Sequence, residues 1–235
     1  HARVGRAKCD GGKGLQGGDR RGRRIRPESP RSDAGPYHQI HQAVVVAVRI
    51  AVGRAEPDPE IQDLIRASAG INLALDYLPG SVMFDPVAEK LDADLASMVV
   101  WFDSFVTNVD RTPRNANMLM WHRRLWLIDH GAALYFHHTW ANYLERSREP
   151  FPMIKDHVLL PFTSPLSLRD IDSKMTERVT PDIIGDIVKL IPDVWLAGGS
   201  QVSNSPFGEP AEYRVAYIEY LMRRLTAPRV FVEEA

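Results

Sequence analysis

The chain has 235 residues, of which 44% are apolar and 25% are charged, and its net charge is −1. These values are typical of a globular protein with a core of its own. No apolar run reaches the ~20 residues that a membrane-spanning helix needs, and the one cysteine, Cys9, excludes an intrachain disulfide. We therefore expect a cytoplasmic protein with no membrane partner.

The first 36 residues differ from the rest of the chain. They contain ten Lys or Arg and four Asp or Glu, a net charge of +6, whereas the remaining residues carry −7. They hold almost no large apolar residues, so they bury too little surface to offset the entropy of ordering and are predicted to be disordered. The arginine-rich residues 20–24 resemble a basic arm, but no aromatic residue lies among them for base stacking, so we expect no nucleic-acid partner.

The first predicted elements are short. Residues 42–52 are apolar and β-branched, which indicates a strand or a short buried helix. Asp58 is a good N-cap and Pro59 a good first helical residue, so a helix is predicted from there to about Ser68. A strand over residues 71–78 follows and ends in a Pro-Gly-Ser turn.

The most regular helical pattern begins at Asp92 or Asp94. Its apolar residues recur at helical spacing and predict a single apolar stripe that packs on a core. The helix leads into a loop at Asp110, where Pro113 prevents it from continuing. The residues of the stripe are Leu95, Met98, Val99, Phe102, Phe105 and Val106.

The C-terminal half is predicted to be mostly helical. Helices are expected over residues 166–175, 181–190 and 211–225. Arg223 and Arg224 fall in the last turn of the final helix, where positive charge complements the helix dipole.

The stretch from residue 108 to residue 131 carries the candidate chemistry. Asp110 is followed five positions later by Asn115, and two apolar runs joined by the basic residues 122–124 then lead to an Asp-His-Gly sequence that begins at Asp129. This pattern predicts a tight β-hairpin. Because antiparallel strands place their ends together, the hairpin would return Asp129 to the side of Asn115.

Two carboxylates and an amide in this arrangement indicate a phosphoryl-transfer site. Such a site needs a carboxylate beside the attacking hydroxyl and hard oxygen ligands for magnesium, and kinase-type sites supply them from an Asp-x-x-x-x-Asn loop and a later Asp-x-Gly. The alternative is that Asp110 and Asn115 only form the turn around Pro113 and that Asp129 begins the hairpin exit, because Asp, Asn and Gly favour turns.

Residues 107–115 read TNVDRTPRN, and residues 127–134 read LIDHGAAL. These segments resemble the HipA-like kinases, in particular the short bacterial HipA-like domain proteins, and more remotely the phosphatidylinositol kinases. Residues 75–81 and 156–162 match as well, so the resemblance runs from about Arg54 to the C-terminus.

The resemblance implies an α+β fold, a protein-kinase-like C-terminal lobe that is mostly helical with a central β-hairpin. It implies ATP and magnesium as cofactors and a hydroxyl of a protein or small molecule as the phosphate acceptor. By resemblance, Asp110 is the catalytic base, and Asn115 and Asp129 bind magnesium. Asp76 and Leu78 would lie at the adenine-binding hinge.

One feature of the kinase pattern is missing from the sequence. Such kinases carry a lysine for the ATP phosphates on a small β-rich lobe before the hinge, and here no lysine occurs between Lys13 and Lys90. We therefore expect residues 1–53 to be disordered or non-native, for example translated out of frame, and residues 54–235 to form the HipA-like kinase domain, mainly its C-terminal lobe. The alternative function is a catalytically inactive kinase-like remnant or a binding module.

The histidines suggest a third function, a metal-dependent hydrolase built on Asp129, His130, His137 and His138. Adjacent side chains rarely converge on one ion, so ordinary polar or packing roles are expected for these histidines. His157 is likewise expected to be structural.

Overall fold

The computed structural model describes residues 44–46, 57–67, 70–74, 77–197 and 206–233. The described part is a mixed α and β structure in which helices accompany one three-stranded and one two-stranded antiparallel sheet. The basic N-terminal segment predicted to be disordered lies outside the described residues, and so does Asp76. No described helix is both long and apolar enough to cross a bilayer.

The first described elements agree with the sequence in type. Strand β1 (Val44–Val46) pairs antiparallel with β2 (Asn72–Ala74). Between them lies α1 (Pro59–Ala67), and Asp58 Oδ1 accepts the backbone N–H of Glu60 at 2.9 Å. The predicted helix start at Asp58 and Pro59 is therefore confirmed.

A turn then leads into a strand that the sequence did not predict. The Ser81 N–H donates to the Leu78 carbonyl at 3.1 Å, and Gly80 has φ of 77°, a conformation that glycine adopts without strain. Strand β3 (Val82–Met83) follows and pairs with β4 (Met118–Trp121). A strand of two residues is too short to show an alternating pattern in the sequence.

The predicted β-hairpin is confirmed. Strands β4 and β5 (Arg124–Leu127) pair antiparallel, with Met118 opposite Leu127 and Trp121 opposite Arg124. The turn contains two residues, His122 with φ of 49° and Arg123 with φ of 61°. Positive φ at both positions is the two-residue turn that matches the twist of the flanking strands. Arg124 belongs to β5 and not to the turn.

Glycine in place of Arg123 is expected to stabilise the fold by about 0.5–1 kcal/mol, because the left-handed backbone costs an L-residue more than it costs glycine. Chemical denaturation measures the change. Arg124→Gly is the matched control, because it makes the same substitution one residue later, inside β5, and is expected to destabilise by roughly 0.5–1 kcal/mol. If Arg123→Gly lowered stability as much as the control, the turn assignment would be wrong.

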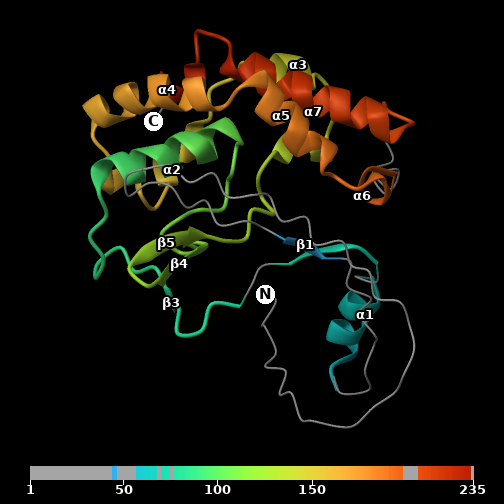
Figure 1. The fold of residues 1–235 in the computed structure, drawn as a ribbon, viewed down its shortest axis with the longest axis horizontal. Helices are drawn as coiled ribbons and strands as arrows, with labels where there is room; N and C mark the ends of the chain where they lie inside the picture. The colour runs from blue at the N-terminus through green and yellow to red at the C-terminus, as the bar shows by residue number, and fades with distance from the viewer. Residues whose placement is uncertain (1–43, 47–56, 68–69, 75–76, 198–205, 234–235) are drawn as a thin grey trace, which may run out of the picture. The chain divides into compact units, whose positions relative to one another are not determined.

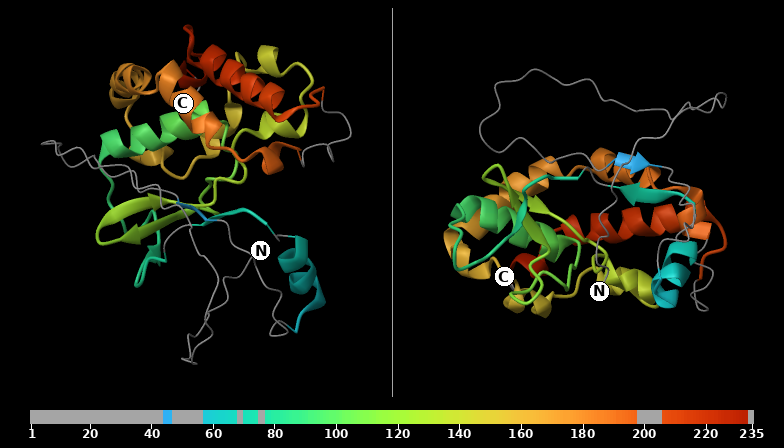
Figure 2. Two further views of the ribbon diagram at one scale, coloured as in Figure 1. Left: turned by 45° about the vertical axis from the view of Figure 1, so that its right-hand side comes forward. Right: turned by 90° about the horizontal axis from the view of Figure 1, so that it is seen from below.

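Helix α2 (Ala93–Phe105) begins where the sequence predicts, since Asp92 Oδ1 accepts the N–H groups of Asp94 and Leu95 at 3.1 Å. Five of the six residues of the predicted stripe belong to the core or pack against it, as expected, and the helix is also buried at residues outside the stripe. Figure 1 and the left view of Figure 2 show the reason: α2 lies between the hairpin and the helices of the C-terminal half. Its buried residues are Ala96, Ser97, Val99, Val100, Trp101, Asp103, Ser104 and Phe105.

The predicted helices of the C-terminal half are all present, and the structure adds short ones before, between and after them. The α-helices are α3 (Tyr143–Arg146), α4 (Pro165–Arg178), α5 (Pro181–Lys189), α6 (Asp193–Ala197), α7 (Pro210–Leu225) and α8 (Val230–Glu233). The 3₁₀ turns are η1 (Tyr135–His138), η2 (Pro152–Asp156) and η3 (Leu160–Phe162).

Two hydrophobic clusters hold these elements together. The larger one surrounds Trp101 and Phe105 of α2 and includes Met118 of the hairpin and Phe231 of α8. The smaller one is aromatic and centres on Phe136, whose ring stacks on Tyr220 of α7. The hairpin and α2 therefore share one core, which fixes the loop between them.

Candidate functional site

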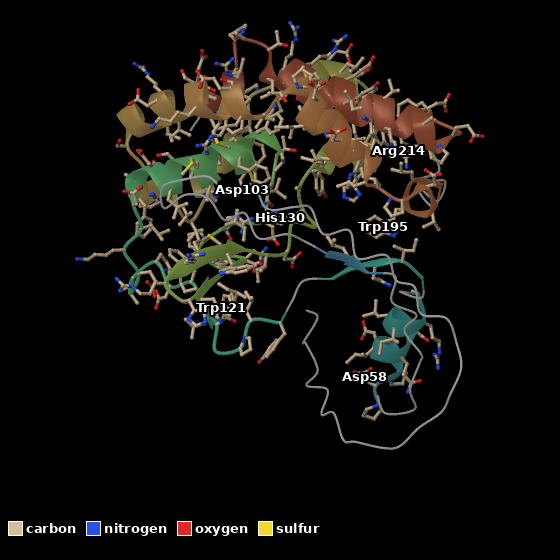
Figure 3. The ribbon with its side chains drawn as sticks, in the orientation of Figure 1. Asp58, Asp103, Trp121, His130, Trp195 and Arg214 are labelled. Carbon is tan, nitrogen blue, oxygen red and sulfur yellow. The ribbon has the colours of Figure 1, made fainter. Side chains whose placement is uncertain are left out.

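The loop that joins α2 to β4 is anchored on a buried carboxylate, Asp103, which is labelled in Figure 3. Its Oδ1 accepts a hydrogen bond from Asn108 Nδ2 at 3.0 Å. Its Oδ2 accepts one from Arg111 Nε at 2.5 Å and one from His157 Nε2 at 2.9 Å. Asp103 therefore binds the loop at two residues and the segment after η2 at a third.

The charge of Asp103 is balanced by Arg111. His157 Nδ1 accepts the N–H of Leu159 at 3.0 Å, so Nε2 is the ring nitrogen that donates to Asp103. Burial alone would raise the pKa of the Asp103 carboxyl. The hydrogen bond from His157 and the charge of Arg111 outweigh burial, and they hold this pKa below its ordinary value.

Arg111 also fixes the backbone that enters β4. Its Nη1 donates to the carbonyl of Asn117 at 2.5 Å and to that of Ala116 at 3.3 Å. Its Nη2 lies 3.4 Å from His130 Nδ1. Partial burial of the ring and then the charge of Arg111 lower the pKa of His130, which favours a neutral imidazole that accepts this contact.

The carboxylate of Asp110 is held by two amides at one of its oxygens. Asp110 Oδ2 accepts Asn115 Nδ2 at 2.7 Å and Asn117 Nδ2 at 3.2 Å, and the Asp110 N–H donates to Asn108 Oδ1 at 3.3 Å. A β-bridge between Thr112 and Asn115 closes the loop. The structure thus brings Asp110 and Asn115 together, as the spacing predicts.

Asn117 is a site residue that sequence reasoning missed. In the sequence it only precedes the first apolar run, yet in the structure it is buried and has φ of 47°. Asparagine is enriched in this left-handed conformation, and an asparagine just before a strand is also a common turn former. The one available signal was a second amide two positions after Asn115.

The hairpin carries Asp129 back toward the loop along the backbone. The Ile128 N–H donates to the Asn117 carbonyl at 2.9 Å, one step beyond the Met118–Leu127 pair. Ile128 therefore faces Asn117, and Asp129 directly follows Ile128. The Asp129 side chain is exposed, its φ is 50°, and its Oδ1 accepts the Gly131 N–H at 3.4 Å.

Leu78, the other predicted nucleotide contact, lies at the far end of the hairpin. Its carbonyl belongs to the turn before β3, and Trp121 Nε1 donates to the carbonyl of the next residue, Pro79, at 2.9 Å. A four-residue strand separates this end from Asn117, about 13 Å of chain. The register of β3 on β4 thus places Leu78 at the turn end, away from Asp110.

The described residues include no group of three His, Cys, Asp or Glu side chains placed to share a metal ion. His137 packs against α7 instead, with its Nδ1 3.2 Å from the Tyr217 hydroxyl. Burial and then the neighbouring His138 lower the pKa of His137.

Asn115 and Asp129 fit magnesium, which takes oxygen ligands and often uses only one or two protein carboxylates together with substrate phosphates. Because Asn115 Nδ2 donates to Asp110, its Oδ1 is the atom that can face a cation.

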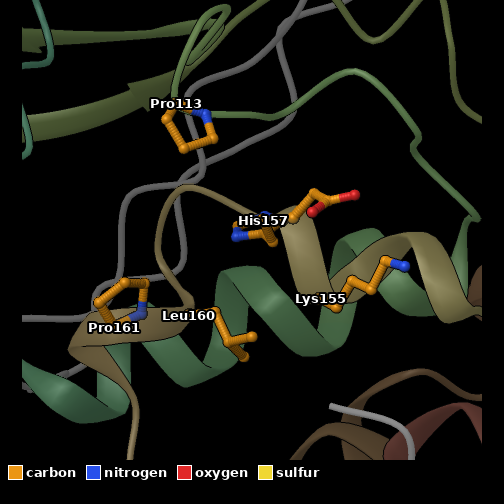
Figure 4. Close-up of a pocket in the computed structure, with 6 residues that line it drawn as sticks. Pro113, Lys155, His157, Leu160 and Pro161 are labelled. Carbon is orange, nitrogen blue, oxygen red and sulfur yellow. The ribbon is translucent and has the colours of Figure 1, made fainter.

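A pocket of about 430 Å³ borders the same loop (Figure 4). Pro113 forms its wall on the loop side, and residues from the η2–η3 segment form the other. The two walls are joined by the Val158 N–H, which donates to the Arg111 carbonyl at 3.1 Å. The lining residues are Pro113, Lys155, Asp156, His157, Leu160 and Pro161.

Comparison with known proteins gives no match to a family model, to a curated protein or to a solved structure. Function is therefore inferred from the geometry around Asp110 and from the motifs at residues 107–115 and 127–134. Both concern the same short stretch of the chain.

Proposed function

We propose that the chain is an ATP- and magnesium-dependent phosphotransferase of the HipA-like kinase type that acts on a hydroxyl group. The observation that carries the proposal is the fixed carboxylate of Asp110, with both asparagine amides on Oδ2. A carboxylate held in this way can accept a hydroxyl proton through its other oxygen, as the catalytic aspartate of kinase-type loops does.

Asp110 is the proposed base. No hydrogen bond to Asp110 Oδ1 is present among the residues that the structure describes, whereas Oδ2 has two donors. Oδ1 would therefore receive the proton of the acceptor hydroxyl as the oxygen attacks phosphorus. The loop that carries Asp110 is anchored on buried groups, which keeps the base in place without help from the acceptor.

Asn115 and Asp129 are the proposed magnesium ligands. The bound ion would neutralise phosphate charge and would orient the nucleotide phosphates beside Asp110. The exposed Asp129 carboxylate and the exposed Asn115 amide are both accessible to a nucleotide from solvent. Leu78, at the other end of the hairpin, would then contact the adenine ring of an ATP molecule that lies along β4.

The pocket beside Pro113 is the proposed place of the acceptor. Its walls carry the apolar side chains of Pro113 and Leu160 and the charged side chains of Lys155 and Asp156. An acceptor with both apolar and charged groups, such as a peptide segment, suits this lining better than a purely apolar molecule.

Asp110→Ala is expected to lower phosphoryl transfer by about 10²–10⁴-fold, the usual contribution of a general base. Asp129→Asn is expected to lower it comparably and to weaken the magnesium dependence, because the metal carboxylate is lost while the left-handed backbone is retained. The measurement is transfer of labelled γ-phosphate from ATP to the protein itself or to added peptides. Asp186→Ala, an exposed carboxylate on α5, is the control and should change nothing. Unchanged transfer in both site variants would refute the proposal.

The alternative, a non-catalytic kinase-like module, is favoured by one observation: the sequence has no lysine between Lys13 and Lys90. Calorimetry with ATP, in the presence and absence of magnesium, separates the two functions. Magnesium-dependent ATP binding that Asp129→Asn weakens supports the kinase. A complete lack of ATP binding supports the non-catalytic module.

A further inference from the structure

Asp110 is one of five residues joined in a closed ring of hydrogen bonds. Asp103 Oδ1 accepts from Asn108, and Asn108 Oδ1 accepts from the backbone N–H of Asp110. Asp110 Oδ2 accepts from Asn117, and the Asn117 carbonyl accepts from Arg111 Nη1. Arg111 Nε donates to Asp103 Oδ2, which closes the ring.

The ring reaches Asp110 from two sides. One branch, through Asn108, fixes the backbone, and the other, through Asn117, fixes the carboxylate. The four other members are almost completely buried, with exposed fractions of 0% for Asp103, 3% for Asn108, 1% for Arg111 and 5% for Asn117. Asn115, which also contacts Asp110, is exposed and is not part of the ring. The two amides on Asp110 Oδ2 therefore differ: the Asn117 amide is buried, and the Asn115 amide is exposed to solvent.

We infer that Asn117 is a positioning residue for the catalytic base and that Asp103 holds it there through Arg111. This inference rests on the proposed function of Asp110. Asn117 occupies one oxygen of the carboxylate from a buried position, so that the other oxygen points toward the acceptor hydroxyl. A hydrogen bond to a charged group in a buried network is both stronger and more directional than one at the surface.

A purely structural role would explain Asn117 differently. Its φ of 47° favours Asn or Gly, so the residue could be present only for its backbone conformation. Asn117→Gly separates the two roles, because glycine accepts the same backbone and removes only the amide. Asn142→Gly is the matched control: Asn142 has φ of 53°, is exposed, and begins α3 away from the site.

The first measurement does not require activity. In a ¹⁵N–¹H spectrum of the full chain, Asp110→Ala is expected to move the side-chain NH₂ signals of both Asn117 and Asn115 and to leave those of Asn142 in place. Asn117→Gly is expected to move the NH₂ signals of Asn115, which shares Asp110 Oδ2. If Asp110→Ala left the Asn117 signals unmoved, the ring would be absent and the inference would be overturned.

The second measurement is steady-state phosphoryl transfer. Asn117→Gly is expected to lower kcat by roughly 10- to 100-fold while KM for ATP stays near its wild-type value, because one hydrogen bond to the base is lost. Asn117→Asp, which places a second carboxylate against Asp110, is expected to lower kcat further. Wild-type kcat in Asn117→Gly would overturn the inference. Absence of transfer in the wild-type chain would instead refute the proposed function, and the spectra would still decide whether the ring exists.

Discussion

Replacing Asp103 with alanine is expected to lower the free energy of unfolding by about 3–5 kcal/mol, because the substitution leaves the Arg111 guanidinium buried without a counter-charge. The side chains of Asp103 and Arg111 are both 0% exposed, so water cannot take the place of the lost carboxylate. The same substitution removes the acceptor of His157 and of Asn108. Urea denaturation of the full chain measures the change.

An exposed ion pair provides the contrast. Asp186 lies 3.0 Å from Lys189 on α5, and both side chains are about three-quarters exposed. Asp186→Ala is expected to cost less than about 1 kcal/mol, because exposed pairs contribute little. Equal losses in the two variants would show that Asp103 and Arg111 do not form a buried pair.

The stability that Asp103 contributes should also depend on pH in a defined direction. Its folded-state pKa is lowered from an ordinary value of 3.8 by the His157 hydrogen bond and the Arg111 charge, despite the opposing effect of burial. A lowered pKa means that the contribution is complete above the unfolded-state value and is lost as pH falls through the folded-state value. The difference in stability between the wild type and Asp103→Asn should stay constant from about pH 7 to about pH 5 and should shrink only below 3.8. A difference that already shrinks between pH 7 and pH 5 would assign the stabilising charge to another group.

Local signals in the sequence were sufficient for the elements on either side of the site. An aspartate before a helical pattern predicted the start of α2 at Asp92 or Asp94, and two apolar runs around a basic turn predicted β4 and β5. In both cases the deciding interactions join residues a few positions apart. The Asp110–Asn115 contact is of the same kind, since it closes within one short loop.

The support of the site was not predictable in this way. His157 lies 54 positions from Asp103 in the sequence, and only tertiary packing brings them together. At helical spacing Asp103 falls outside the apolar stripe, where a carboxylate normally faces solvent. The loop and the η2–η3 segment bury that face, so Asp103 is stable there only because Arg111, Asn108 and His157 donate to it. A buried polar network of this kind leaves no periodic trace in the sequence.

Arg224 shows the same limit. It lies in the last turn of α7, as predicted, but it is also buried and donates to the ends of two other helices, which the sequence did not indicate. Its Nη2 donates to the Ser104 carbonyl at 2.7 Å and its Nε to the Phe105 carbonyl at 2.9 Å, both in the last turn of α2. Its Nη1 donates to the carbonyls of Ser147 and Glu149, at and beyond the end of α3.

One guanidinium thus satisfies carbonyls that the ends of α2 and α3 leave without a helical partner. Burial lowers the pKa of Arg224, and the negative ends of the two helices offset this cost of desolvation. Because α2 leads directly into the loop of Asp110, Arg224 also fixes the end of the helix from which that loop begins.

Arg224→Met is therefore expected to destabilise the chain by about 3–5 kcal/mol, because buried carbonyls lose their donors while the volume of the side chain is roughly kept. Arg224→Lys should recover only part of the loss, since an ammonium cannot reproduce the planar fork that reaches both helix ends. Arg223→Met is the matched control, because Arg223 is the preceding residue of the same helix and is exposed; a change below about 0.5 kcal/mol is expected. The measurement is the midpoint of urea unfolding at constant slope. Equal effects of Arg223→Met and Arg224→Met would mean that positive charge near the end of α7 matters, and not the bridge between α2 and α3.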